Sequence, residues 1–117
     1  MRNLNSVLIE GNLTSDPDER TVGDGTRLCR FSIAYNRMYK TADDMRDEVS
    51  FFDVEVWGDR AAPCIDYLQK GKKVRVIGRL KQDRWETAEG SRRERISIVA
   101  EHVEFGPGAR QAPQEKS

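Results

Sequence analysis

The sequence predicts an all-β domain, a small barrel of five strands with one short α-helix between the third and fourth strands. Five stretches alternate between apolar and polar residues, as strands with one buried face do. One segment between the third and fourth stretches has helical spacing, and turn residues separate the others. A chain of 117 residues forms one domain, and closing its sheet on itself is an economical way to protect the sheet edges.

Spacing and turn residues place the first two strands. The first is predicted over residues 5–13, where Val7 and Ile9 share one face. A Gly-Asp-Gly sequence at 23–25 is typical of a hairpin turn. The second strand follows over residues 27–36, where alternate residues are apolar.

The third strand, residues 49–57, carries aromatic residues on the face that is not its core face. Phe51 and Trp57 alternate there with the carboxylates of Asp53 and Glu55. Large apolar groups on a solvent-facing strand need an explanation. From this strand alone two explanations stay open: the rings pack under a loop or in an oligomer contact, or they form a stacking platform for unpaired bases.

The helix and the last two strands complete the predicted barrel. The helix is predicted over residues 61–70 and ends at Gly71. The fourth strand covers residues 72–85 and the fifth covers residues 92–105, with a hairpin turn at 87–91. The outward face of the fourth strand combines basic residues with an aromatic one: Arg75, Arg79, Lys81 and Trp85.

Two polar segments are predicted to lie outside regular structure. Residues 37–48 predict a long, mobile hairpin loop, in which Tyr39 either stacks on a base or folds down over the sheet. Residues 107–117 predict a short disordered tail, so that residues 1–106 form the folded domain. Five strands with a helix after the third is the arrangement of the five-stranded Greek-key OB-fold barrel.

The charge of the chain is balanced overall but not along its length. There are 20 basic and 20 acidic residues. Residues 41–69 contain eight acidic and two basic side chains, whereas residues 70–95 contain ten basic and four acidic ones. The second segment predicts either a solvated charged surface or a basic stripe that binds phosphate.

Several classes of function find no support in the composition. Two separated cysteines and the single histidine, His102, do not form a usual zinc site, so we expect no metal or cofactor. No nucleophile with a histidine–carboxylate pair and no phosphate-binding glycine loop is present, so we expect no enzymatic activity. Without a membrane-length apolar run or a signal sequence, we expect a soluble, cytoplasmic, nucleoid-associated protein.

The remaining features favour binding of single-stranded nucleic acid. Such binding needs flat side chains for the bases and cations along the phosphates. The candidate stacking residues are Tyr39, Phe51, Trp57 and Trp85. The candidate phosphate-binding residues are Arg37, Lys40, Lys72, Lys73, Arg75, Arg79, Lys81 and Arg84. No predicted helix has the row of basic and amide side chains that reads a duplex major groove.

Several motifs, taken in order, resemble those of bacterial single-stranded DNA-binding proteins. They extend over residues 5–106: NSVLIEGNL at 5–13 with DP at 16–17, FFDVEVWG at 51–58, YLQKG at 67–71, and GRL at 78–80 followed by RW at 84–85. This family resemblance implies an OB-fold homotetramer, a dimer of dimers. Such a protein wraps single-stranded DNA with little sequence preference during replication, recombination and repair.

The resemblance also implies roles for individual positions. Tyr39, Phe51, Trp57 and Trp85 match stacking positions of the family. Lys70 and Arg84 match basic contacts to the phosphate backbone. Val7 and Ile9 lie in the strand through which family members pair. Family members usually end in an acidic tail that recruits other proteins, whereas this sequence ends in QAPQEKS, so we expect such recruitment to be absent.

A second hypothesis comes from a different class of function. An OB-fold protein of this size is also suited to act as a protein–protein adaptor of a primosome or replication complex. Such an adaptor would not need Phe51, Trp57 and Trp85 to be free at the same time. Stacking and backbone charge do not by themselves distinguish RNA from DNA.

Overall fold

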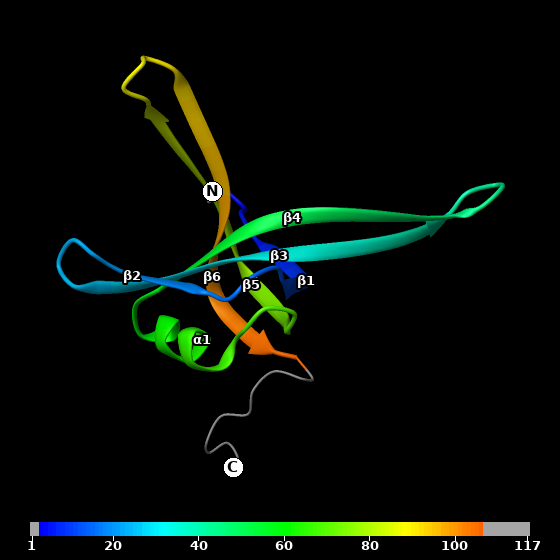
Figure 1. Cartoon of the computed structure of the whole chain (residues 1–117), viewed down its shortest axis with the longest axis horizontal. Helices are drawn as coiled ribbons and strands as arrows, with labels where there is room; N and C mark the ends of the chain where they lie inside the picture. The colour runs from blue at the N-terminus through cyan, green and yellow to red at the C-terminus, as the bar shows by residue number, and fades with distance from the viewer. Residues whose placement is uncertain (1–2, 107–117) are drawn as a thin grey trace, which may run out of the picture.

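A computed structural model of the chain describes residues 3–106 and contains six strands, a 3₁₀ turn and one α-helix (Figure 1). The elements are β1 (Val7–Leu13), β2 (Asp18–Val22), β3 (Thr26–Lys40), β4 (Met45–Trp57), η1 (Gly58–Arg60), α1 (Ala61–Tyr67), β5 (Lys73–Glu86) and β6 (Arg92–Phe105). Within the described range no helix has the length and apolar character needed to cross a membrane. The predicted tail, residues 107–117, lies outside the described residues.

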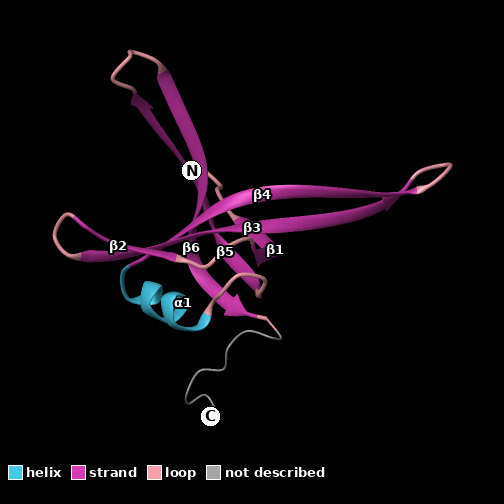
Figure 2. Cartoon of the chain, in the orientation of Figure 1, coloured by secondary structure: helices cyan, strands magenta, loops and turns pink. Residues whose placement is uncertain are grey.

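The sheet closes into a barrel, which confirms the predicted fold. Its strand order is β1-β5-β6-β4-β3-β2, and an additional β1–β3 pairing joins the ends of the five barrel strands. β4 and β6 run parallel, and the other strand pairs are antiparallel. The helix follows the third barrel strand, as the OB arrangement requires, and lies below the barrel in Figure 2.

Two segments outside the predicted strands are strands in the structure. Residues 18–22 form β2, which pairs with β3 across the predicted Gly-Asp-Gly hairpin. β3 and β4 stay paired out to Lys40 and Met45, so the long loop predicted over 37–48 was wrong. Polar side chains do not prevent this pairing, because a two-stranded ribbon exposes both faces to solvent while its backbone hydrogen bonds continue.

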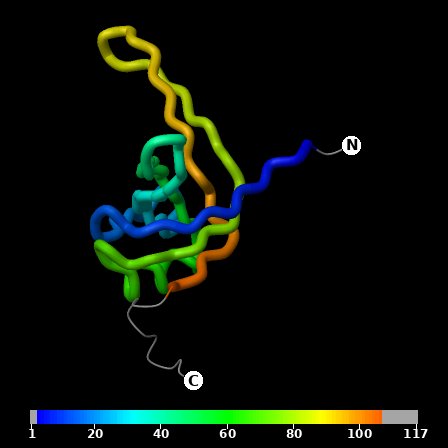
Figure 3. Tube along the Cα trace, turned by 90° about the vertical axis from the view of Figure 1, so that its right-hand side faces the viewer, coloured from blue at the N-terminus to red at the C-terminus, as the bar shows by residue number. Residues whose placement is uncertain are grey.

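The long hairpins make two arms that project from the barrel. The β3–β4 arm extends to the right in Figure 1, and the β5–β6 arm extends upward. In Figure 3 the β5–β6 arm again rises above the barrel, away from the helix. Residues on the outward faces of both arms therefore do not pack in the hydrophobic core.

The core fills the barrel with the predicted inward residues. Its buried members are Leu13, Cys29, Phe31, Ile33, Val54, Val56, Ala61, Cys64, Leu68, Val74, Val76, Ile98 and Ala100. Phe52, Leu80 and Ile96 continue the inward alternation but are exposed. A hydrogen bond to Cys64 and burial raise the pKa of the Cys29 thiol.

Two glycines allow strands to approach closely where the barrel closes. A Cβ on Gly11 would lie 2.6 Å from the carbonyl oxygen of Ala34, where β1 crosses onto β3. A Cβ on Gly78 would lie 2.1 Å from the carbonyl oxygen of Val99, beside a register shift between β5 and β6. Neither position has room for a side chain, so both glycines are required by the packing of backbone on backbone.

Candidate nucleic-acid interface

The outward face of β4 presents the two predicted aromatic residues. Phe51 is 66 % exposed and pairs in register with Ala34 of β3. Trp57 is partly buried and pairs with Leu28. The Phe51 ring is therefore open to solvent on the face opposite the buried Val54 and Val56, which a structural role in the barrel does not explain.

Trp85 lies on the β5–β6 arm and is also accessible. It is 45 % exposed and pairs in register with Arg93 of β6. The guanidinium carbon of Arg95 lies 5.7 Å from the centre of one of its rings. A hollow of about 560 Å³ adjoins it, lined by Arg84, Trp85, Glu86, Arg92, Arg93 and Glu94. The hollow therefore combines one aromatic ring with three cations and two carboxylates.

The strand register brings these aromatic residues onto one continuous face. Asp53 of β4 pairs with Ser97 of β6, and Ser97 pairs with Lys81 of β5. β4, β6 and β5 thus lie side by side, and their outward residues share a surface. We call this surface the aromatic face, defined by Phe51, Trp57, Arg79, Lys81, Trp85, Arg93 and Arg95.

Trp57 is held by two charged side chains on this face. Its Nε1–H donates to Oε1 of Glu55 at 3.1 Å. The Lys81 ammonium lies 5.5 Å from the ring centroid and 3.4 Å from the same Glu55 oxygen. One side of the indole is therefore covered by a cation, and its polar edge is fixed.

Tyr39 lies apart from the other stacking candidates. Phe51 pairs with Ala34, so the even-numbered residues of β3 lie on the same face of the ribbon as Phe51. Arg37 and Tyr39 are odd-numbered and lie on the opposite face. The Arg37 guanidinium carbon is 4.9 Å from the Tyr39 ring centroid, and Arg37 also pairs with Glu48 at 3.2 Å. The structure thus gathers Phe51, Trp57 and Trp85 on one face and does not bring Tyr39 to it.

The predicted phosphate-binding residues also separate into groups. Arg79 and Lys81 lie on the aromatic face, whereas Lys40 ends β3 at the tip of its arm and Arg84 lies on the opposite face of β5 from Trp85. The remaining basic residues lie near the other end of β5: Lys70, Lys72, Lys73 and Arg75. A strand of this length spans roughly 40 Å, so the latter group is remote from Trp85.

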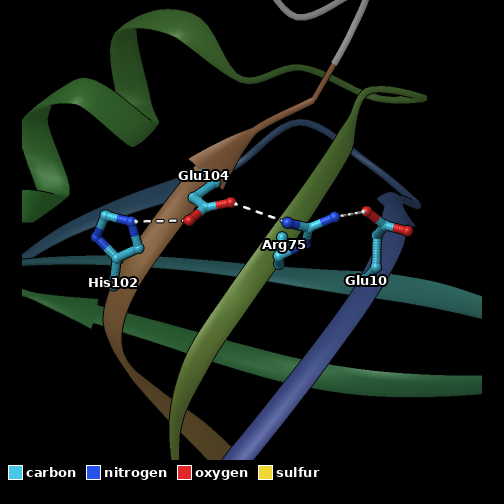
Figure 4. A network of polar contacts seen from close by, with 4 residues as sticks. All are labelled: Glu10, Arg75, His102 and Glu104. Atoms are coloured by element: carbon cyan, nitrogen blue, oxygen red, sulfur yellow. Dashed lines mark hydrogen bonds and ion pairs between the residues drawn. The ribbon is translucent and has the colours of Figure 1, made fainter.

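Arg75 is already engaged in a network of ion pairs. Its guanidinium contacts Glu10 at 3.1 Å and Glu104 at 3.3 Å, and Glu104 also lies 3.3 Å from His102 (Figure 4). The network joins the outward sides of β1, β5 and β6. Two carboxylates at Arg75 reduce its attraction for phosphate.

Sequence reasoning missed two cations of the aromatic face, Arg93 and Arg95. Both lie on β6 and face Trp85 or its neighbours across the β5–β6 ladder. Counting the register outward from the predicted turn at 87–91 would have paired Trp85 with Arg93. The sequence therefore contained the information needed to place Arg93 opposite Trp85.

The predicted oligomer residues Val7 and Ile9 are partly buried and pack against the core. Between them Leu8 points outward and is 70 % exposed. β1 pairs with β5 along residues 7–12 but with β3 only at Asn12 and Leu13. The other backbone edge of β1 before Asn12 therefore has no strand partner among residues 3–106.

Comparison with known proteins gives the family. The model of the single-strand binding protein family matches residues 4–106. The chain belongs to the single-strand binding protein family. This membership confirms the resemblance seen in the sequence motifs.

Individual relatives agree with this assignment. A single-stranded DNA-binding protein of Treponema pallidum is 43 % identical over 105 residues, which cover 90 % of this chain and 59 % of that protein. One from Aquifex aeolicus is 41 % identical over 101 residues, covering 86 % and 68 %. The chain thus spans about three fifths of the length of the Treponema relative. A solved structure, a Plasmodium falciparum SSB complex with ssDNA, matches with a TM-score of 0.81 at 22 % sequence identity. The match covers 91 % of this chain and 97 % of that chain, and it supports the fold.

Proposed function

We propose that this member of the single-strand binding protein family binds single-stranded DNA with little sequence specificity, in replication, recombination and repair. The observation that carries the proposal is the aromatic face, where Phe51 and Trp85 are accessible and cations lie over the rings of Trp57 and Trp85. Stacking on an aromatic ring contributes about 1–3 kcal/mol per base and accepts any base. Rings and cations together therefore favour strand binding without sequence reading.

The spacing of the rings supports an extended strand rather than a single bound nucleotide. Phe51 and Trp57 are six residues apart on β4, which corresponds to roughly 20 Å along a strand. Trp85 adds a third position on the neighbouring arm. Tyr39 then serves a segment of DNA that passes over the other side of the β3–β4 arm.

Cations on and around the aromatic face would contact the phosphates. Arg79 and Lys81 lie on the aromatic face, Arg84 lies on the opposite face of the β5–β6 arm, and Arg37 and Lys40 lie along the β3–β4 arm. Lys70, Lys72 and Lys73 extend this set of cations toward the helix end of the barrel, whereas Arg75 contributes less because two carboxylates hold it. Binding through these groups weakens as salt rises, because bound counterions are released.

The same proposal includes assembly into a homotetramer, a dimer of dimers, through β1. Within residues 3–106 the backbone edge of β1 before Asn12 has no strand partner, and this edge and the exposed Leu8 support pairing with a second copy. Val7 and Ile9 lie in that strand, and their inward side chains would fix its register. Light scattering coupled to size exclusion measures the mass, and a monomeric mass at micromolar concentration would contradict this part of the proposal.

The test of strand binding is a fluorescence titration with oligo(dT). Both tryptophans, Trp57 and Trp85, lie on the aromatic face, so stacking quenches the emission directly. We expect strong quenching by single strands, little quenching by a duplex of the same length, and weaker binding at high salt. No quenching at low salt would overturn the proposal and favour the adaptor hypothesis.

A further inference from the structure

Glu55 is a buried carboxylate within a face that the proposed function assigns to a polyanion. It is 5 % exposed, although it lies on the outward side of β4 between Asp53 and Trp57. A negative charge at this position repels phosphate. Strand binding by itself therefore gives no reason for Glu55, and its contacts must supply one.

Glu55 joins an aromatic ring to a cation. The same oxygen, Oε1, accepts the indole N–H of Trp57 at 3.1 Å and lies 3.4 Å from Nζ of Lys81. Nζ of Lys81 also lies 5.5 Å from the Trp57 ring centroid. The three side chains form a closed triangle of contacts, which we call the Glu55 cluster.

The strand between them makes this triangle possible. Lys81 is on β5 and Glu55 is on β4, and β6 runs between the two strands. The β6 residue paired with Lys81 is Ser97, which is 2 % exposed and whose Oγ has no hydrogen-bond partner within residues 3–106. A small residue here leaves room for the lysine stem to cross β6.

We propose that Glu55 is the positioning residue for Trp57. It fixes the polar edge of the indole and anchors Lys81 over one ring face, so that a base stacks only on the opposite face. This inference rests on the proposed strand binding. A ring held in its binding orientation before DNA arrives loses less conformational freedom on binding, which strengthens the complex.

The experiment uses the full chain with Trp85→Phe as the parent, because Trp57 is then its only tryptophan. Glu55→Met keeps the side-chain length but removes both contacts of the carboxylate. Glu55→Gln keeps an oxygen that accepts the indole N–H. Asp83→Asn is the matched control, since Asp83 lies 3.6 Å from Lys81 Nζ and its removal deletes a carboxylate beside the same lysine.

Two quantities are measured for each variant. The first is the fluorescence anisotropy of Trp57 in the free protein, which reports how firmly the ring is held. The second is the affinity for oligo(dT) at about 1 M salt, where the Debye length is about 3 Å and loss of a charge has little effect. Circular dichroism confirms that each variant is folded.

We expect Glu55→Met to lower the anisotropy and to weaken binding at least about fivefold, part of the value of one stacked base. Glu55→Gln and Asp83→Asn should stay close to the parent in both measurements. If Glu55→Met equals the parent in anisotropy and affinity, the proposal is wrong. If the parent itself does not bind oligo(dT), strand binding fails, while the anisotropy still decides whether Glu55 holds the ring.

A further measurement needs no change at Glu55. In the parent, the indole N–H of Trp57 should exchange with deuterium at least about tenfold more slowly than in the urea-unfolded chain. Exchange at the unfolded rate would show that the N–H is not held, and it would overturn the proposal even if Glu55→Met did not fold.

Discussion

Replacement of Trp85 by alanine gives a direct measure of what the aromatic face contributes. Trp85 is 45 % exposed, lies on an arm outside the core, and has Arg95 at 5.7 Å from its ring. The Arg95 guanidinium thus lies over one side of the Trp85 ring, and we expect a single base to stack on the ring. The change should therefore cost about 1–3 kcal/mol of binding free energy, or roughly a 5- to 150-fold weaker Kd.

The assay is the anisotropy of a labelled oligo(dT) at two salt concentrations, with Trp85→Phe as the control that keeps a ring. The alanine variant should lose affinity at both salt concentrations, and the phenylalanine variant should lose much less. The free energy of unfolding of the alanine variant in urea should differ from that of the wild type by less than about 1 kcal/mol, because the Trp85 side chain is outside the core. An affinity within about twofold of wild type at both salt concentrations would refute the stacking argument.

Further predictions test the phosphate contacts, the barrel and the core thiol. Lys40→Ala should reduce the slope of log K against log salt by about 0.7 if Lys40 binds one phosphate, and an unchanged slope would exclude that contact. Gly78→Ala should destabilise the barrel by about 1–3 kcal/mol or more in urea unfolding, because its Cβ would lie 2.1 Å from the Val99 carbonyl oxygen. Ile33→Ala, at a fully buried position, should cost about 2–5 kcal/mol, seen as a lower Tm, and a loss below about 1 kcal/mol would contradict the core described above. Cys29 is fully buried in the core, so thiol reagents should label it at pH 8 only as fast as the chain unfolds.

The strand alternation was predictable because it follows from backbone geometry alone. Side chains of a strand alternate between two faces, so Val54 and Val56 had to lie opposite Phe51 and Trp57 once the strand was recognised. Inward residues of one barrel strand meet those of the others, and the core could be predicted in the same way. This reasoning requires only local sequence.

The arms were not predictable by the same reasoning. Beyond the barrel both faces of a two-stranded ribbon meet solvent, and residues 37–48 therefore show no apolar alternation although they are paired. The face on which Tyr39 lies follows from that pairing and could not be assigned from a predicted loop. The pairing of Arg75 with Glu10 and Glu104 depends on the register of three strands that are distant in sequence.

The tip of the β3–β4 arm offers a place to engineer the protein without disturbing its core. The turn is closed by local contacts only: the backbone N–H of Thr41 donates to the carbonyl oxygen of Asp44 at 2.7 Å, and the Thr41 hydroxyl caps the same residue. Extra residue pairs inserted here would lengthen the ladder while the barrel keeps every packing contact. The length of the arm can in this sense be changed independently of the barrel, and a peptide tag or a fluorophore placed in the turn would move with the arm and report its position.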